Sequence, residues 1–213
     1  MPAKPADEMP APRTRRNRGD ELYQAALTIF AEKGYDATSM QDVADAVGVL
    51  KGSLYHYVNS KEDLLFHLFS QAHERSERLM DEVAESDRNP VEKLRYYLQR
   101  LIFSSLDDAD FTRLYWRDWR SLTGERLNRL VEQRRQYDLY LRRLIADAYV
   151  SLGLKPSTNL RYISSFATGG ANWVADWYRK DGADSAEKIA EAYTELAMGA
   201  ILAGAQADPS SNN

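Results

Sequence analysis

Apolar residues recur at steps of three and four along most of the chain, the spacing that places them on one face of an α-helix. Capping residues, glycines and prolines cut this pattern into segments, and only Pro90 and Pro156 fall within the body of the chain. We therefore predict an all-α fold of about nine helices without strands. The predicted helices are one at 20–33, a short one between the capping box Thr38–Gln41 and Gly48, and others at 51–57, 61–84, 90–102, 109–120, 127–148, 160–179 and 186–203.

The second and third predicted helices are short and are separated by the tight link Val47-Gly48-Val49. Two short helices joined in this way and packed on a preceding helix form a helix-turn-helix, whose second helix enters the major groove of DNA. The helix that begins at Lys61 is long enough to join two domains. We expect a disordered basic arm (1–18), a DNA-binding domain (19–62), a ligand-binding and dimerisation domain (63–206) and a disordered tail (207–213).

The net charge of −4 is unevenly distributed. Residues 1–61 contain eight basic and eight acidic residues, so the rest of the chain carries the whole acidic excess. A basic arm at Arg13–Arg18 on an acidic body suits contact with phosphate, although the arm can equally be a tail of solvated charges. The chain has no cysteine and no secretory signal pattern, and its longest apolar run is nine residues, against about 20 in a membrane span. We expect a cytoplasmic protein without a membrane partner.

The predicted groove helix is rich in side chains that contact nucleic acid. Lys51 can reach a phosphate or a guanine edge, Gly52 allows the DNA backbone to approach, and the next residues offer hydroxyl groups and rings, at Ser53, Tyr55, His56 and Tyr57. Lys61 opposes the macrodipole at the start of its helix, which indicates a phosphate clamp there. The alternative is an aromatic helix packed in a core, but only Leu54 and Val58 are good core residues.

The segment from about Arg18 to Phe69 resembles the DNA-binding domain of the TetR (tetracycline repressor) family of bacterial regulators. The resemblance is carried by the runs GYDATSMQDVADAVGV, KGSLYHYV and SKEDLL, in the family's order and spacing. It implies an all-helical homodimer on double-stranded operator DNA, with phosphate contacts at Thr38 and Ser39, a backbone clamp at Lys61, and groove contacts at Lys51, Gly52, Ser53, Tyr55, His56 and Tyr57. One residue departs from the pattern: Leu50 occupies the cap position of the groove helix, where many members have Ser or Thr.

The C-terminal run NWVADWYRKDGADSAEKIAEAYTELAMGAI is similar to the last two helices of regulators that control fatty-acid, sterol or other acyl-CoA catabolism. These helices present more apolar surface than one subunit needs, which indicates a four-helix interface between two copies. An intrachain core is the alternative. The expected interface residues are Phe166, Gly170, Trp173, Trp177, Tyr193, Leu196 and Ala200.

Aromatic residues are unusually frequent between residues 103 and 140, and Arg134 falls on an apolar stripe among them. A buried guanidinium needs a partner, which is either Asp118 or the anionic end of a small hydrophobic effector of the acyl-CoA type. The expected effector-binding residues are Phe103, Arg113, Trp116, Arg117, Trp119, Arg134, Tyr137 and Tyr140.

The sequence predicts no catalytic residue, metal site or cofactor. Ser53 and His56 lack an orienting carboxylate at a suitable spacing, and His67 and His73 lie about 240° apart around a helix. We expect a ligand-responsive repressor that binds a palindromic operator as a homodimer. A transcriptional activator of the same fold, and a helical small-molecule-binding protein or enzyme without a DNA function, are the alternatives.

Overall fold

The computed structural model describes residues 15–208, and side chains from residue 19 onward. In this part of the chain, the predicted all-α fold with nine α-helices is confirmed. The elements are α1 (Arg15–Lys33), α2 (Met40–Ala46), α3 (Lys51–Leu54), α4 (Lys61–Glu85), α5 (Pro90–Asp107), α6 (Ala109–Asp118), the 3₁₀ turn η1 (Trp119–Ser121), α7 (Gly124–Ser151), β1 (Leu154–Pro156), α8 (Leu160–Trp177), α9 (Ala186–Ala203) and β2 (Ala205–Ala207).

The two strands correct the expectation that the chain has none. Strand β1 pairs antiparallel with β2, with Leu154 opposite Ala207, and so ties the end of α7 to the end of α9. Each strand has only three residues, too few for the alternation that identifies a strand in sequence. The expected tail 207–213 is therefore ordered at its first residue, and residues 209–213 lie outside the described chain.

Two other expectations are wrong near the N-terminus. The backbone of residues 15–18, expected in the disordered arm, belongs to α1, while residues 1–14 lie outside the described chain. The capping box of α2 is formed by Ser39 and Asp42 rather than by Thr38 and Gln41. Both capping pairs have the same three-residue spacing, so the sequence alone does not decide between them.

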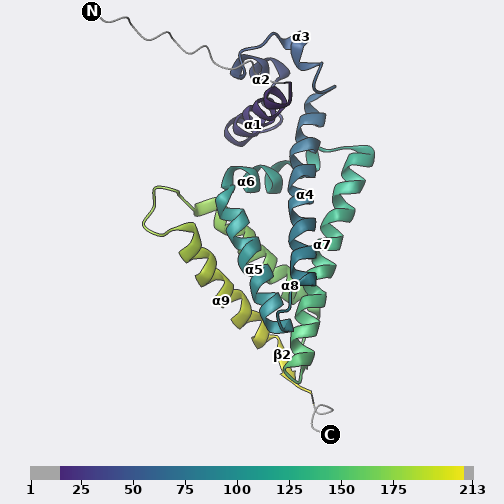
Figure 1. Cartoon of the computed structure of the whole chain (residues 1–213), viewed down its shortest axis with the longest axis vertical. Helices are drawn as coiled ribbons and strands as arrows, with labels where there is room; N and C mark the ends of the chain where they lie inside the picture. Colours follow the sequence, from purple (N-terminus) through teal and green to yellow (C-terminus); the bar gives the residue numbers. More distant parts are fainter. Residues whose placement is uncertain (1–14, 209–213) are drawn as a thin grey trace, which may run out of the picture.

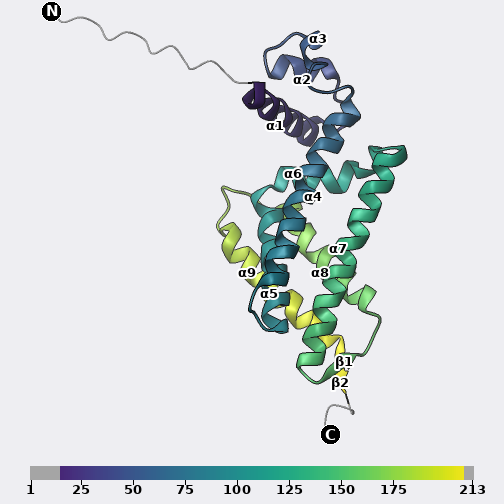
Figure 2. The ribbon, with the colours of Figure 1, turned by 45° about the vertical axis from the view of Figure 1, so that its right-hand side comes forward.

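The molecule is elongated, with α1, α2 and α3 at one end (Figure 1). Helix α4 begins beside them and runs on into a bundle with the helices α5 to α9, as a second view also shows (Figure 2). The core under α1–α3 also contains Leu114 of α6 and Leu130 of α7. The end formed by α1–α3 therefore shares its core with the rest of the chain.

The link between α2 and α3 depends on Gly48, whose φ of +66° lies in the left-handed region. An L-residue pays about 1–2 kcal/mol for that conformation, which explains a glycine here. The amide of Val49 then donates to the carbonyl of Ala44 at 3.0 Å and closes the turn.

Among the helices in residues 15–208, none combines the length and apolar character needed to cross a membrane.

Candidate nucleic-acid interface and effector site

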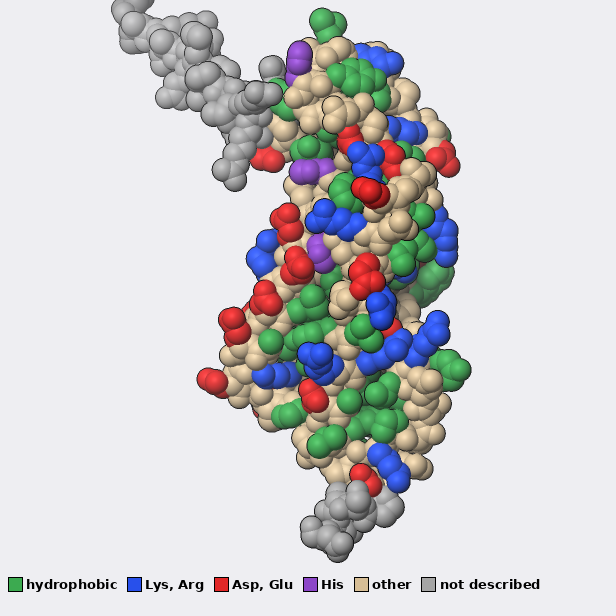
Figure 3. Space-filling model, turned by 90° about the vertical axis from the view of Figure 1, so that its right-hand side faces the viewer, with side chains coloured by type: hydrophobic (Ala, Val, Ile, Leu, Met, Phe, Trp, Pro, Cys, Tyr) green, Lys and Arg blue, Asp and Glu red, His purple; other side chains and the backbone are tan. Residues whose placement is uncertain are grey.

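Helix α3 has one face in the core and one face in solvent. Leu54 and Val58 are buried and fix the segment against α1 and α2. Lys51, Tyr55 and His56 are exposed, and Figure 3 shows basic, histidine and hydrophobic side chains together at this end of the molecule. The structure therefore brings Lys51, Gly52, Tyr55 and His56 to one accessible surface, whereas Ser53 is half-buried and Tyr57 packs, half-buried, against the core.

Gly52 is exposed on this surface, and its backbone has a conformation that any residue can adopt. A Cβ atom built there meets no other atom within 4 Å, so neither internal packing nor the backbone conformation requires glycine. In a helix, alanine is favoured over glycine by about 1 kcal/mol. The absence of a side chain is thus costly to the fold and useful only to something that approaches from outside.

Thr38 and Ser39 occupy different environments. Only 2% of Thr38 is exposed, and its hydroxyl donates to the Gly34 carbonyl at 2.8 Å. The expected phosphate contact by the Thr38 side chain is therefore wrong, because this side chain is buried and closes the loop between α1 and α2. Ser39 is exposed, and its hydroxyl accepts from the Asp42 amide at 3.2 Å. Hydrogen bonds from Ser39, together with Lys33, hold the pKa of Asp42 well below its usual value.

The Lys61 side chain points into the protein. Its ammonium group donates to the carbonyls of Tyr35 at 2.8 Å and Thr38 at 2.9 Å, and lies 4.2 Å from the centre of the Tyr35 ring. The expected phosphate clamp by this side chain is corrected: Lys61 positions the loop before α2. The clamp by the backbone amide of Lys61 stays a prediction, since the first amides of a helix have no partner within it.

Two arginines expected at the effector site instead connect helices. Arg117 donates to the carbonyls of Phe30 at 2.5 Å and Ala31 at 3.3 Å, at the C-terminal end of α1, and to the neighbouring Asp118. Arg113 donates to the Ala175 carbonyl of α8 at 2.5 Å. Each guanidinium is thus occupied by the protein, and Arg117 joins α6 directly to the end of α1.

Arg134 lies among aromatic rings, as its place in the apolar pattern predicts. Its guanidinium carbon is 4.4 Å from the ring centres of both Trp116 and Trp119, and 5.5 Å from that of Tyr115. Burial raises the pKa of Tyr115, against the opposing effect of Arg134. The expected internal partner, Asp118, is instead bonded to Arg117 and to the amide of Tyr35, the latter at 3.4 Å.

One nitrogen of Arg134 is left without a partner. Its Nη1 atom is buried and has no hydrogen-bond partner among the described residues. A buried donor left unpaired costs about 1–3 kcal/mol, so such an atom calls for an explanation. The faces of the rings stabilise the positive charge of the guanidinium. They offer no acceptor in the plane of the guanidinium, which is where the N–H groups of Nη1 point.

The other expected effector residues lie elsewhere. Phe103 packs with α8 and α9, the Tyr137 hydroxyl bonds to Nδ1 of His73, and the Tyr140 hydroxyl donates to the Met80 carbonyl at 2.9 Å. Burial raises the pKa of Tyr137 well above its usual value. The predicted set therefore divides among separate places and does not line one cavity.

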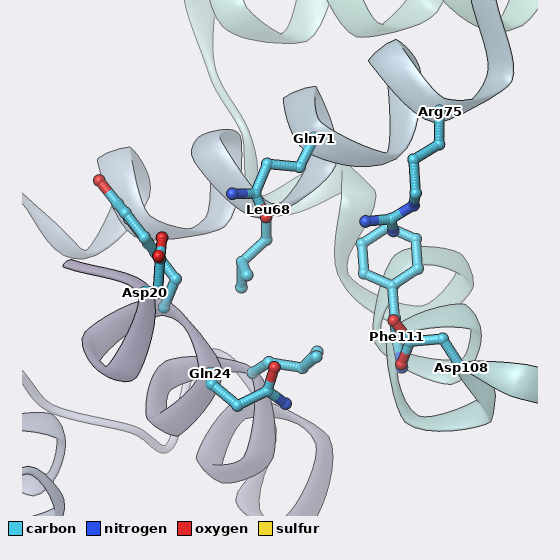
Figure 4. Close-up of a pocket in the computed structure, with 9 residues that line it drawn as sticks. Asp20, Gln24, Leu68, Gln71, Arg75, Asp108 and Phe111 are labelled. Carbon is cyan, nitrogen blue, oxygen red and sulfur yellow. The ribbon is translucent and has the colours of Figure 1, made fainter. Parts of the chain in front are cut away.

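Two hollows in the described chain have other linings. One of about 210 Å³ lies between α1, α4 and α6, with Asp20 and Gln24 facing Gln71 and Arg75 across it (Figure 4). Asp108, which also lines it, is half-buried, and this loss of solvent raises the pKa of its carboxyl group. The second, of about 400 Å³, is an open hollow beside α7 that includes Lys93 and Leu144. Sequence reasoning found neither, because each is formed by residues far apart in the chain.

An apolar face covers the outside of α8 and α9. Phe166 is 71% exposed and Leu196 67%, and Trp173 and Trp177 are exposed beside them. Tyr162, also exposed, belongs to the same helix but was not expected in the set. The remaining expected residues are exposed or half-buried, at Gly170, Tyr193 and Ala200.

The comparisons with known families cover both ends of the chain. Residues 22–68 match the family model described as "Bacterial regulatory proteins, tetR family". Residues 87–201, more than half of the chain, match the one described as "Tetracyclin repressor-like, C-terminal domain".

Individual relatives align over nearly the whole chain. The HTH-type transcriptional repressor KstR2 of Mycolicibacterium smegmatis is 28% identical over 196 residues, which cover 87% of this chain and 91% of that protein. The structure of the ketosteroid transcriptional regulator KstR2 of Mycobacterium tuberculosis superposes with a TM-score of 0.80 at 22% identity, covering 88% of this chain and 95% of that one. The structure of AibR in complex with isovaleryl coenzyme A and operator DNA superposes with a TM-score of 0.75 at 24% identity. The superposition covers 84% of this chain and 97% of that one. These solved structures share the fold.

We expect Lys61→Met to lower the free energy of unfolding by about 1 kcal/mol. Hydrogen bonds from a charged donor contribute about 1.5–3 kcal/mol, and removing a cation from a helix N-terminus returns about 0.3–1 kcal/mol. Urea denaturation followed by circular dichroism measures the change. Lys51→Met, which removes an exposed lysine from the same end, is the control and should leave stability unchanged; equal stability of both variants would contradict the positioning role of Lys61.

Proposed function

Because the chain belongs to the TetR family of bacterial transcriptional regulators, we propose that it is a homodimeric repressor that binds a palindromic operator and is released by a small, anionic, hydrophobic effector. The observation that carries the DNA-binding part is the two-sided character of α3. Buried Leu54 anchors the helix, while Lys51, Gly52 and Tyr55 are exposed and unused by the fold. Repression is the activity named for the KstR2 relatives.

A dimer is supported by the apolar face of α8 and α9. Trp173 and Leu196 expose most of their surface, and a Cβ built on Gly169 or Gly170 meets nothing within 4 Å. Small residues beside large exposed ones allow a second helix pair to approach closely. A two-fold dimer presents two copies of α3, which is the arrangement that reads a palindrome.

The effector site is supported by the surroundings of Arg134. Its unpaired Nη1 is suited to an acidic or carbonyl oxygen, and the neighbouring rings of Trp116 and Trp119 offer apolar surface. Both rings lie 4.4 Å from the guanidinium carbon, and an effector that reaches Nη1 would displace at least one of them. The AibR structure contains isovaleryl coenzyme A, and we propose that an acyl-CoA is also the effector class here.

Release follows from the position of α6. This helix carries Trp116 beside Arg134, and the next residue, Arg117, is bonded to the end of α1. Displacing the tryptophan therefore disturbs the contact that orients the DNA-binding end. Shifting a two-state equilibrium from 1:99 to 99:1 takes about 5.5 kcal/mol of differential affinity, which the effector has to supply by binding one arrangement better.

The operator test uses a duplex selected by the protein from random sequence. We expect Lys51→Met to weaken binding and to reduce the slope of log K against log salt by about 2, since each phosphate contact adds about 0.9 and the dimer makes it twice. Fluorescence anisotropy at several salt concentrations measures both quantities. Lys180→Met, which removes an exposed lysine between α8 and α9, is the matched control. Unchanged affinity and slope in Lys51→Met would reject α3 as the reading helix.

We expect Leu196→Glu to convert the dimer into a helical monomer, because two buried carboxylates would face each other across the axis. Sedimentation velocity and circular dichroism measure association and folding. Val150→Glu places the same charge on an equally exposed apolar position at the end of α7 and should leave the dimer intact. A dimeric Leu196→Glu variant would place the interface elsewhere.

We expect Arg134→Met to bind the operator normally but to be released by acyl-CoA at least tenfold less well, because the anionic or carbonyl group loses the buried guanidinium that would bind it. The unfolding free energy should not fall, since the variant also removes an unpaired buried donor. Anisotropy titrations with a series of acyl-CoAs, and with coenzyme A alone, measure release. Arg135→Met is the control on the exposed side of the same helix, and normal release of Arg134→Met would refute the site.

A further inference from the structure

Leu50 has the most exposed large apolar side chain of the described residues, with 81% of its surface in solvent. It stands at the N-cap of α3 with an extended backbone, φ −68° and ψ 141°, and its side chain makes no capping hydrogen bond. Because its backbone is not helical, its side chain does not follow Leu54 into the core. It lies instead beside Lys51 on the outer surface of the helix-turn-helix.

This residue weakens the isolated subunit in two ways. The N-cap position favours Ser, Thr, Asp or Asn, and leucine leaves the first amides of the helix without that partner. Its apolar surface also stays hydrated, so the stabilisation available from burial is not obtained. A single exposed leucine is common on protein surfaces, but here it replaces a cap at the very start of the reading helix.

The surroundings restrict what can cover Leu50. Helices α8 and α9, which carry the exposed apolar face, lie in the bundle away from the end of the molecule that holds α3 (Figure 1), so the proposed dimer leaves Leu50 free. The neighbouring Lys51, Tyr55 and His56 are polar or basic and exposed, which suits a polyanion rather than an apolar protein partner. Within the major groove, the apolar feature that base edges present is the C5-methyl group of thymine.

We propose that Leu50 packs against a thymine methyl group in each half-site and thereby selects a T·A pair at that position. This inference rests on the proposed operator binding and adds a specificity-determining residue to it. Leucine at this position gives up the capping hydrogen bond of α3 and provides an apolar contact with a base instead. Burial of one methyl-sized group corresponds to about a fourfold change in affinity per half-site, and so to about 15-fold for both.

The test replaces thymine by deoxyuridine in the selected operator, one symmetric pair at a time. This substitution removes only the methyl group and leaves every hydrogen-bonding edge intact. We expect one pair of positions at which deoxyuridine weakens binding of the wild-type protein about 15-fold. Leu50→Ala should show no such loss at that pair, so that the double-mutant cycle assigns the methyl contact to Leu50.

Two further variants keep the result unambiguous. Leu50→Ser restores a capping side chain, so it should fold at least as stably as the wild type and also be insensitive to deoxyuridine. Val150→Ala shortens an exposed apolar side chain away from α3 and should retain the full loss. If the wild type binds its operator but the loss at every pair is the same in Leu50→Ala, the Leu50 proposal is wrong while operator binding stands. If the wild type prefers no duplex sequence, the proposed function itself fails.

Discussion

The carbonyl groups at the end of α1 hold the two ends of this molecule together. A helix leaves its last carbonyls without partners, and they carry partial negative charge. Arg117 from α6 donates to Phe30 and Ala31, and Lys61 from α4 donates to the loop that follows. These two cations and the core that α1–α4 share with Leu114 and Leu130 together set the direction in which α3 faces.

The helices and the helix-turn-helix were predictable because they depend on local patterns. Apolar spacing, capping residues and glycines such as Gly48 act within a few residues, and the sequence shows them directly. The errors lie at the same scale: Thr38 and Ser39 are both good caps, and only packing decides that Thr38 is buried. The strand pair joins residues about fifty positions apart and leaves no local signal.

The candidate site was only partly predictable for the same reason. The sequence predicts Arg134 among aromatic rings, and the structure places its guanidinium beside Trp116 and Trp119, with Nη1 buried and the residue as a whole half-buried. It does not indicate that Arg117 reaches a helix more than eighty residues earlier, or that Phe103 and Tyr140 face different parts of the bundle. Residue type reveals which side chains need a partner, whereas the identity of the partner depends on the fold.

The core shared by α1–α4 with Leu114 and Leu130 has a consequence for engineering. Hybrid regulators are made by joining the DNA-binding module of one protein to the sensor of another. A junction near residue 62 in this chain would separate side chains that fill one interior, and would leave Arg117 without the carbonyls it binds. A working hybrid has to carry the inner surfaces of α6 and α7 along with the first three helices, so the transferable module is defined by a surface rather than by a stretch of sequence.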